Sequence, residues 1–426
     1  MAIRDLIEHS PRRRKLLRVL AAGTAGAALP GAAGTLAAAL SGRPTSGGVP
    51  ASPASPPPRV IKDGLGFRRL GRTNLMISEI SLGGSPLPDE GLLRRLVDRG
   101  INYIDTSDSY ENGNCERKVG RLFQAVGRDK LFIHARFHLQ GPWTERSIVA
   151  SVEGSLRRLG TDYTDILGIH GVEKPEDVTD ERVLAAFEKL KGKFRFRGLT
   201  CHVNAHAVIP KAVECGLYDM VQVGYNVFDL QETEKEVKTY GDYLGESGIR
   251  KLIDLCRSKD VGVTAMKVLK VGGRRQDLAS TRAGGTSLFQ AMLKWALENE
   301  SLASVVTEIL NDSQMDEDLG ALDKPLTGSE RRMLHAHVAA NAGDYCHFCG
   351  LCGAACRAGV PTAEASRSLV YAESYGKPDR ADKELAGIRA SLLACSDCGA
   401  CERVCPYGLA VRERTRRAEH TIPQAG

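Results

Sequence analysis

The sequence lacks a strong excess of charge of either sign. Its 58 Lys and Arg residues against 52 Asp and Glu residues give a formal net charge of +6. Residues 1–39 hold six basic and two acidic side chains, so the rest of the chain has a formal charge of only +2. Nucleic-acid-binding domains concentrate basic residues in a patch or stripe. The composition therefore predicts no nucleic-acid partner.

Two patterns of cofactor-binding enzymes are also missing. No flavin-binding pattern is visible in the sequence. No H-x-E pattern accompanies the histidines near expected strand ends and loops, which are His134, His138, His202 and His206. A metal bound by these histidines is therefore not expected.

Eight of the twelve cysteines form two runs near the C-terminus. The runs are Cys346-x2-Cys349-x2-Cys352-x3-Cys356 and Cys395-x2-Cys398-x2-Cys401-x3-Cys405-Pro406. Three thiolates from one such turn can bind three corners of a [4Fe-4S] cube, and the spacing matches ferredoxins that bind two [4Fe-4S] clusters. In those ferredoxins the fourth ligand comes from the other run. The resemblance implies Cys405 as the fourth ligand of the first cluster and Cys356 as that of the second.

Structural zinc and disulfides are the alternatives for these cysteines. Zinc needs only four thiolates per site and gains nothing from a third C-x2 step or from Pro406, so clusters are favoured. The first run departs from the ferredoxin pattern at Arg357, where Pro is usual. Helical character at 363–373 and 383–394 predicts a small, mainly helical ferredoxin-like domain. The remaining cysteines are expected to be buried thiols, namely Cys115, Cys201, Cys215 and Cys256.

The N-terminal residues predict an export signal. A basic segment containing Arg13-Arg14-x-Leu16-Leu17 precedes an uncharged, Ala- and Gly-rich stretch from Val19 to Ser41. The pattern resembles a twin-arginine signal, and small residues around Ala37 would permit cleavage. That route exports folded proteins, which suits a cluster assembled in the cytoplasm. We therefore expect a periplasmic or otherwise extracytoplasmic protein, membrane-bound only if the signal stays uncleaved.

Five segments are expected along the chain. A Pro-, Ser- and Gly-rich tether follows the signal, and alternating strand and helix patterns fill the centre. The expected segments are a signal at 1–40, a tether at 41–60, a large domain at 61–325, a connecting helix at 326–345 and the cysteine domain at 346–426.

The large domain contains eight short apolar segments separated by helical patterns. They are 77–82, 101–104, 131–134, 166–170, 196–200, 220–225, 261–266 and 305–310. This count predicts an α/β fold, the (β/α)8 TIM barrel, whose active site lies at the C-terminal ends of the strands. Those ends carry the polar residues Asp105, Arg136, His170, Thr200, Gln222 and Lys267.

Three motifs in this domain resemble the aldo/keto reductases. They are GFRRLGRT at 66–73, GINYIDTSDSY at 100–110 and DYTDILGIH at 162–170. The resemblance covers most of residues 66–315, and one branch of that family carries a C-terminal ferredoxin module. It implies a barrel that binds NAD or NADP and a small carbonyl-type substrate.

The resemblance also implies catalytic roles. Tyr110 maps to the acid that protonates the carbonyl oxygen, Asp105 to the orienting carboxylate and His170 to the substrate-side imidazole. The family has a Lys at the end of the third strand, where this chain has Arg136, a planar and wider cation. A cation beside the phenol is expected to bring the tyrosine pKa down towards neutrality.

The expected nucleotide contacts depart further from the family. Thr200 is followed by Cys-His where Ser-Asn is usual, while Gln222 and Tyr225 stand where amide binding and ring stacking are expected. Lys267 begins a basic, Gly-containing loop through 275 that would hold a pyrophosphate or remain a solvated loop. Glu308 near the eighth strand would repel the 2′-phosphate of NADP.

A hydride carries two electrons and a [4Fe-4S] cluster accepts one, so transfer between them needs an intermediary. The favoured function is an exported oxidoreductase that acts on a small carbonyl-type molecule and relays electrons through two clusters to or from a redox partner protein. The main alternative is a non-catalytic barrel that serves as a docking or ligand-binding platform. A cytoplasmic NADPH reductase is a third interpretation.

The arginines at 412–417 form either a solvated helix face or a docking face for an acidic partner.

Overall fold

A computed structural model of the chain describes residues 59–139, 143–230, 248–269, 278, 280–374 and 378–421. The predicted signal at 1–40, the tether through residue 58 and most of the basic loop after Lys267 lie outside the described residues. Within those residues, no helix combines the length and the apolar character needed to cross a membrane.

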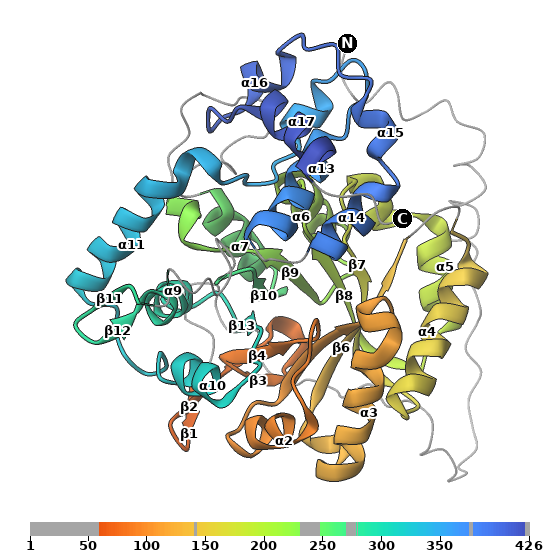
Figure 1. Cartoon of the computed structure of the whole chain (residues 1–426). Coiled ribbons are helices and arrows are strands. Elements are labelled where there is room, and N and C mark those ends of the chain that lie inside the picture. Colours follow the sequence, from red (N-terminus) through yellow and green to blue (C-terminus); the bar gives the residue numbers. More distant parts are fainter. Residues whose placement is uncertain are drawn as a thin grey trace, which may run out of the picture. The chain divides into compact units, whose positions relative to one another are not determined.

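Eight parallel strands close into a barrel, in the order β10, β13, β4, β5, β6, β7, β8, β9 (Figure 1). The strands are β4 Ile80–Gly83, β5 Tyr103–Ser107, β6 Phe132–His138, β7 Thr164–His170, β8 Phe194–Cys201, β9 Met220–Gly224, β10 Gly262–Met266 and β13 Ser304–Thr307. All eight predicted segments contribute to this barrel, so the predicted fold class is confirmed.

Amphipathic helices surround the barrel and bury their apolar faces against it. They are α2 Glu90–Asp98, α3 Asn114–Val126, α4 Glu145–Leu159, α5 Glu181–Lys189, α6 Ala205–Cys215, α7 Gly248–Ser258, α9 Leu288–Leu297 and α10 Asp312–Leu319. Local sequence fixes several helix starts, because a side-chain oxygen accepts a hydrogen bond from a backbone N–H of the first turn. Thr144 and Ser287 do so within capping boxes at α4 and α9.

A three-stranded antiparallel sheet closes the N-terminal end of the barrel. It consists of β1 Arg59–Lys62, β2 Leu65–Arg69 and β3 Met76–Ser78. Leu70 and Ile77 from this region pack against Tyr103 near the start of β5. The prediction of one strand over 77–82 was wrong, since β3 and β4 are separate. Glu79 lies between them, and its carboxylate accepts hydrogen bonds from Arg59 and Arg68.

Helix α11, Gly328–Asn341, follows the barrel and packs against α9. Its N-terminus is a capping box in which Thr327 accepts from Glu330 N. The carboxylate of Glu330 also lies 2.7 Å from Lys294 Nζ on α9, and both side chains are at least 95 % buried. This buried ion pair attaches α11 to the barrel.

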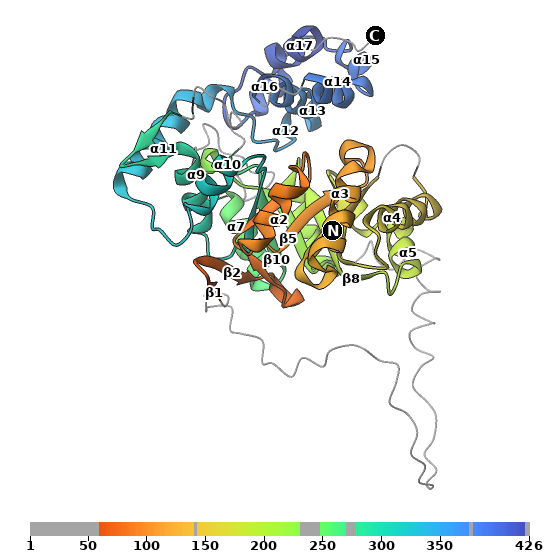
Figure 2. The ribbon, with the colours of Figure 1, turned by 60° about the horizontal axis from the view of Figure 1, so that its bottom comes forward.

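Every regular element described after residue 345 is helical, as predicted (Figure 2). The elements are α12 Leu351–Ala354, α13 Thr362–Leu369, the π-helical turn η8 Val370–Ser374, α14 Pro378–Ala386, α15 Arg389–Leu392, α16 Ala400–Val404 and α17 Val411–Thr421. Helices α13, α14 and α17 pack around a small core that includes Leu369 and Leu385.

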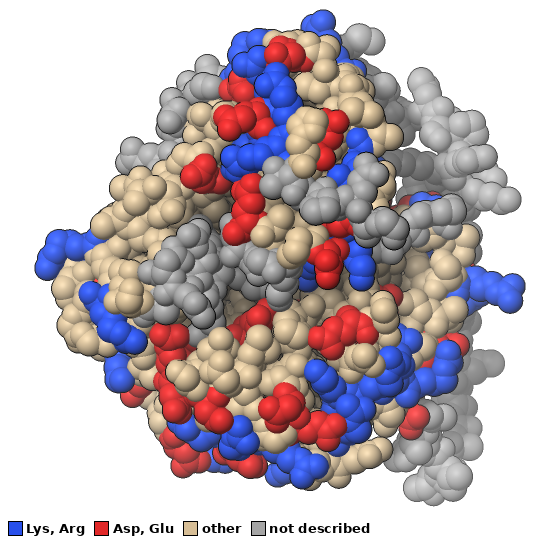
Figure 3. Space-filling model, viewed as in Figure 1, with Lys and Arg blue, Asp and Glu red and all other residues tan. Residues whose placement is uncertain are grey.

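The cysteine domain contacts loops that follow the C-terminal ends of the barrel strands. Asn204 N donates to Phe348 O at 2.8 Å, and Asn226 Nδ2 donates to Tyr345 Oη at 2.7 Å. Arg367 on α13 forms an ion pair with Glu173 after β7. On the face shown in Figure 3, basic and acidic side chains are interspersed, without one large area of a single sign.

Candidate functional site

A hydrogen-bonded group joins three of the predicted catalytic residues. Arg136 Nη2 donates to Asp105 Oδ2 at 2.6 Å and to Tyr110 Oη at 2.7 Å. Asp105 is the middle residue of β5, Arg136 lies on the adjacent β6, and Tyr110 follows β5 in the next loop. The structure therefore brings Asp105, Tyr110 and Arg136 together.

The loop after β5 places Tyr110 by means of an unusual backbone. Glu111 and Asn112 have φ values of 48° and 54°, and Gly113 has φ 81°. These successive left-handed residues follow Tyr110 directly and turn the chain sharply into helix α3. Gly84 leaves the space for Tyr110, because a Cβ there would meet the backbone of Asp105 and lie 3.3 Å from the Tyr110 ring.

The pKa of Tyr110 lies above its ordinary value. Burial raises the pKa of the phenol and outweighs the opposing effect of Arg136. The predicted shift of the Tyr110 pKa towards neutrality was therefore wrong in direction. Removing the phenolate from water destabilises it more than the nearby cation stabilises it. Tyr110 stays protonated at neutral pH. Its oxygen accepts from Arg136, and its O–H can donate to a ligand.

Arg136 is a buried cation, only 2 % exposed, and it donates hydrogen bonds to four residues. Besides its bonds to Asp105 and Tyr110, it donates to Thr200 Oγ1 at 3.2 Å and to Thr106 O at 3.3 Å. Burial alone lowers its pKa, but Asp105 and Tyr110 favour the charged form and the net pKa is raised. A guanidinium presents several donors in one plane, and a lysine ammonium at this position would not reach all four partners.

His170 lies beside this group on β7. Its Nδ1 is 2.9 Å from Ser107 Oγ, and its ring meets the Tyr110 ring edge to face at 5.5 Å between centroids. Burial first, and then the charge of Arg136, hold the pKa of His170 well below its ordinary value. The imidazole is therefore neutral, and all four predicted catalytic residues share one region.

Three further histidines surround the site. His138 and His202 lie 3.9 Å and 5.3 Å from His170 between ring centroids. His134 lies inside the barrel, with Nδ1 3.3 Å from Asp105 Oδ1. A Cβ at Gly168 would meet its ring, so that glycine makes room for it. No three His, Cys, Asp or Glu side chains among the described residues approach closely enough to hold a single metal ion.

Most of the side chains predicted to bind a nicotinamide interact with other side chains of the barrel domain instead. Thr200 Oγ1 donates to Gln222 Oε1 at 3.0 Å, and Gln222 Nε2 donates to Asp105 Oδ2 at 3.3 Å. Both side chains are fully buried. Tyr225 is buried as well, stacked on Trp295 at 4.6 Å between centroids. These three residues therefore do not fit a nicotinamide in the predicted manner.

The space next to Tyr110 forms a pocket with walls from both domains. Its empty volume is about 580 Å³, a figure that includes space open to solvent. The barrel contributes Asp105, Tyr110, Arg136, His202, Lys267 and Glu308, and the cysteine domain contributes Tyr371 and Arg380. Sequence analysis missed Tyr371 and Arg380, because nothing in their local sequence indicates a pocket.

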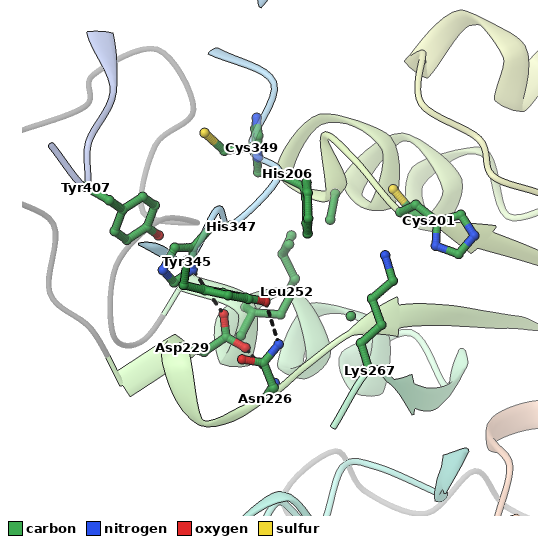
Figure 4. A pocket seen from close by; sticks show the side chains of 15 residues that line it. Cys201, His206, Asn226, Asp229, Leu252, Lys267, Tyr345, His347, Cys349 and Tyr407 are labelled. Carbon is green, nitrogen blue, oxygen red and sulfur yellow. Dashed lines mark hydrogen bonds and ion pairs between the residues drawn. The ribbon is translucent and has the colours of Figure 1, made fainter. Parts of the chain in front are cut away.

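A second pocket lies next to the first, and Cys349 is among the residues that line it (Figure 4). His202 and Lys267 line both pockets, and the second is also lined by Cys349 of the cysteine domain and by Tyr345 just before that domain. Lys267 has φ 62°, a conformation that costs energy in a non-glycine residue and that often marks functional sites. Its Nζ lies 5.1 Å from the centroid of the Phe348 ring.

The two cysteine runs have the same backbone design. The residue before the second cysteine is left-handed in both, with φ 53° at Phe348 and φ 57° at Asp397. A left-handed glycine follows that cysteine in both, with φ 78° at Gly350 and φ 71° at Gly399. A short helix then carries the third cysteine in each run, α12 or α16. The repeated turn therefore arranges three thiols in the same way twice.

The first run lies near the last cysteine of the second, because Cys346 and Cys352 pack against the buried hydrophobic cluster that contains Cys405. Burial raises the pKa of Cys349, and the neighbouring thiols of Cys346, Cys352 and Cys405 raise it further. Backbone N–H groups of Phe348 and Leu409 donate to the sulfurs of Cys346 and Cys405 at 3.4 Å. Such bonds stabilise cluster-ligating thiolates. This donor set fits a [4Fe-4S] cluster, with Cys405 in the predicted crossed position.

The second set of thiols is more open to solvent. Cys395 and Cys398 are exposed, whereas Cys401 is buried. The pKa of Cys401 is raised by burial and also by the nearby thiol of Cys395. Cys356 packs against the helical core of the domain. The pocket beside the barrel is therefore lined by a thiol of the first set, while the second set reaches the surface.

Comparisons with known proteins match both parts of the chain. The Aldo/keto reductase family profile matches residues 89–283, and the 4Fe-4S dicluster domain profile matches residues 342–409. L-galactose dehydrogenase of Arabidopsis thaliana is 26 % identical over 294 residues, covering 60 % of this chain and 88 % of that protein. The uncharacterized oxidoreductase YqkF of Bacillus subtilis is 28 % identical over 301 residues, covering 64 % and 96 %.

Another relative matches in sequence, and two solved structures match the fold. A probable voltage-gated potassium channel subunit beta of Oryza sativa is 26 % identical, covering 60 % of this chain and 91 % of that protein. The aldo-keto reductase AKR11C1 from Bacillus halodurans has a TM-score of 0.50 at 23 % identity, covering 63 % and 95 %. An aldo-keto reductase from Klebsiella pneumoniae in complex with NADPH has a TM-score of 0.50 at 22 % identity, covering 63 % and 94 %.

Proposed function

We propose that this chain, in which an aldo/keto reductase family domain precedes a 4Fe-4S dicluster domain, is an oxidoreductase that converts a small carbonyl compound and its alcohol. In this proposal the substrate binds beside Tyr110. The electrons are exchanged with a partner protein through two [4Fe-4S] clusters, held by Cys346, Cys349, Cys352 and Cys405 and by Cys395, Cys398, Cys401 and Cys356.

The adjacency of the two pockets carries this proposal. His202 and Lys267 line the pocket that holds Tyr110 and also the pocket lined by Cys349. A substrate beside Tyr110 would therefore be separated from the first thiol set by few side chains. When bound, [4Fe-4S] clusters supply one-electron transfer, so two of them match the two electrons of a carbonyl reduction.

The barrel residues would bind the carbonyl group and supply a proton. Reduction of a carbonyl to an alcohol takes two electrons and two protons, one on the oxygen from Tyr110 and one on the carbon from solvent, to which the pocket is open. Tyr110 keeps its proton at neutral pH, and its O–H is the donor for the carbonyl oxygen. Arg136 holds the phenol oxygen in place and stabilises negative charge that develops there, and Asp105 fixes the guanidinium.

A nicotinamide has less support than the clusters. Solved relatives include one in complex with NADPH, but Thr200, Gln222 and Tyr225 are buried and engaged in this chain. No step of the proposed reaction uses a nicotinamide. The same observation argues against the cytoplasmic NADPH reductase.

The partner protein would bind near the exposed thiols of the second set. Leu393 is 71 % exposed and Val404 is 36 % exposed, and each is within two residues of a cysteine of that run. Arginines 403, 412 and 416 lie around the same turn, where they contact Cys398 O, Glu402 and Asp397. Since Arg412 and Arg416 are paired with carboxylates, the exposed apolar side chains carry the argument that a one-electron carrier protein docks here.

We further propose that the protein works outside the cytoplasm after export by the twin-arginine route. Its N-terminal sequence supports this location, as argued above. Fractionation of cells that make the full chain tests it. Replacing Arg13 and Arg14 with Lys should retain the protein in the cytoplasm, and equal export of the double variant would contradict the proposal.

A docking platform remains the second candidate function, because Tyr371 and Arg380 of the cysteine domain line the substrate pocket. A turnover assay distinguishes the two candidates. The protein is isolated anaerobically with its clusters and supplied with a carbonyl compound and either reduced methyl viologen or NADPH. Turnover that depends on the viologen supports the proposed enzyme. Turnover with NADPH alone contradicts the electron route, and no turnover with any of a broad set of carbonyl compounds favours the platform.

A further inference from the structure

Arg414 is a buried cation on helix α17, and it is only 5 % exposed. The burial of this helix follows the helical period, with Val411, Arg414, Thr415 and Ala418 buried on one face. This spacing is typical of the face of a helix that packs on a core, where apolar side chains are usual. A charged side chain therefore occupies a core position of α17.

The other buried cations show what such a position normally requires. In the part of the chain that the structure describes, the buried Lys and Arg side chains besides Arg414 each form an ion pair with a carboxylate. The pairs are Arg68 with Glu79, Arg136 with Asp105 and Lys294 with Glu330. Arg414 has no carboxylate of a described residue within ion-pair distance, and in this respect it differs from the other three.

The guanidinium of Arg414 is bound at one nitrogen by a neutral group. Its Nη1 donates to Asp344 O at 2.8 Å, whereas its buried Nε has no hydrogen-bond partner. A guanidinium has five N–H donors, and a buried charge without a counter-charge is strongly destabilising. Arg414 therefore has both the charge and a donor for an anionic group.

The first set of thiols lies beside this guanidinium. Asp344 is two residues before Cys346, so the hydrogen bond to its carbonyl places Arg414 at the start of the first cysteine run. Burial raises the pKa of Cys346, and the charge of Arg414 is the largest influence in the opposite direction. Val411 on α17 packs in the same hydrophobic cluster as Cys405, against which Cys346 also packs. Arg414 therefore adjoins the donor set that fits a [4Fe-4S] cluster.

The neighbouring arginines of α17 have carboxylate partners. The pairs are Arg412 with Glu402, Arg416 with Asp397 and Arg417 with Glu373. The three arginine side chains are 34 %, 53 % and 34 % exposed. The basic residues at 412–417 therefore do not form one uniform face, because Arg414 differs from the rest in burial and in pairing.

We propose that Arg414 is the counter-charge of the first [4Fe-4S] cluster and raises the reduction potential of that cluster. The inference rests on the cluster ligands assigned in the proposed function, and it does not depend on the carbonyl substrate. An oxidised cluster with four thiolates has a charge of about −2 by ligand counting, and one-electron reduction adds a further negative charge. Arg414 therefore stabilises both oxidation states and the reduced state more. It favours an electron on the cluster that lies nearer the barrel.

Redox titration of the full chain tests this inference without any carbonyl compound. The protein is isolated anaerobically with its clusters, titrated with dithionite in the presence of mediators, and followed by low-temperature paramagnetic resonance. Arg414→Gln removes the charge and keeps a donor for Asp344 O. At a fixed potential, the ratio of reduced to oxidised first cluster should fall about tenfold or more, which corresponds to a shift of about 59 mV or more to lower potential. The second cluster should titrate as in the wild type.

Three further variants identify the signals and isolate the charge. Cys398→Ser alters a ligand of the second set alone and so shows which signal belongs to the first cluster. Arg417→Gln is the matched control, because it removes a cation of the same helix that is paired with Glu373. It should leave the potential of the first cluster unchanged. Arg414→Lys keeps the charge and should retain most of the wild-type potential.

An iron count covers the case in which a variant no longer binds the first cluster. Loss of about four iron atoms per chain in Arg414→Gln, with their retention in Arg414→Lys, supports the inference. The inference is overturned if folded Arg414→Gln has wild-type potentials, or if Arg414→Lys lowers the potential or the iron content as much as Arg414→Gln does. A wild-type protein that binds no iron–sulfur cluster would overturn this inference together with the proposed electron route. The expected shift in a protein without carbonyl turnover would instead count against the proposed reaction alone.

Discussion

Arg136 uses a single nitrogen, Nη2, to donate to both Tyr110 Oη and Asp105 Oδ2, at 2.7 Å and 2.6 Å. The phenol oxygen therefore acts as an acceptor within the site, and its hydrogen is directed elsewhere. This relationship supports the proposed roles, in which Tyr110 donates the proton and Arg136 positions the phenol and stabilises developing charge. The following predictions depend on it.

Tyr110→Phe should reduce carbonyl turnover about 10²- to 10⁴-fold, the range for loss of a general acid. The ring and its edge contact with His170 would remain, so stability should change little. Tyr163→Phe is the control, because Tyr163 lies before β7 at the other end of the barrel and stacks on Arg128. Unchanged turnover in Tyr110→Phe would remove Tyr110 from the reaction.

Arg136→Lys should lower turnover with reduced methyl viologen and should not create turnover with NADPH. A lysine cannot replace all four hydrogen bonds of the buried guanidinium, and each lost partner costs about 1–3 kcal/mol when it is left unsatisfied. Chemical denaturation and both donor assays check this. Arg146→Lys, on the exposed side of α4, is the control. A gain of NADPH turnover would mean that Arg136 performs the same role as the family's Lys, only less effectively.

Activity should be nearly independent of pH between 6.5 and 10. Burial raises the pKa of Tyr110 above 10, so its proton is lost only as the pH rises beyond that value. Burial lowers the pKa of His170 well below 6.5, so its ring gains a proton only as the pH falls below that value. An initial-rate profile with saturating reductant measures this. A limb between pH 6.5 and 9 that disappears in Tyr110→Phe would contradict the account.

Gly84→Ala should displace Tyr110 and reduce turnover. The added Cβ would meet the carbonyl of Asp105 and approach the Tyr110 ring, which costs about 1–3 kcal/mol in a packed site. Gly343→Ala is the control, since a Cβ there meets nothing within 4 Å. Comparing turnover and melting temperature separates the two effects. Full activity in Gly84→Ala would show that the close approach is unimportant.

The attachment of α11 should weaken in acid. Burial alone would raise the pKa of Glu330, but hydrogen bonds from Lys294 and from neighbouring donors lower it from 4.5 to about 2. The stabilisation is complete above pH 4.5 and is lost as the pH falls towards 2. Glu330→Gln should destabilise the fold by about 3 kcal/mol at neutral pH, because it leaves Lys294 buried without its anion.

Denaturation of the wild type and Glu330→Gln from pH 7 to pH 3 measures this contribution. The difference between the two proteins should shrink as the pH falls. Glu317→Gln, on α10, serves as a carboxylate control of the same size. A constant difference across the range would show that the ionised form of Glu330 is not responsible.

The barrel and the cysteine turns were predictable because both are encoded by local spacing. Apolar segments at regular intervals indicated all eight strands, and the C-x2-C-x2-C pattern indicated the ligand turns. The break between β3 and β4 was not predicted. The buried carboxylate of Glu79 is stabilised by hydrogen bonds from Arg59 and Arg68, and both arginines lie outside the apolar segment from which the strand was predicted.

The site was predictable only where its residues lie on the barrel strands. Asp105, Arg136 and His170 follow from their strand-end positions. The burial of Tyr225 against Trp295 depends on a helix 70 residues later, and Arg380 reaches the pocket only because two domains pack together. The direction of the Tyr110 pKa shift also depends on the degree of burial, which a sequence pattern does not specify.

A single-turnover measurement tests the central claim most directly. The protein with both clusters is reduced by two electrons per chain, freed of excess reductant, and mixed anaerobically with each of a broad set of small carbonyl compounds while the clusters are followed by paramagnetic resonance. The account predicts that with at least one compound both clusters reoxidise and about one molecule is reduced per chain, with loss of this reaction in Tyr110→Phe. Clusters that remain reduced with every compound that the protein binds would contradict the account.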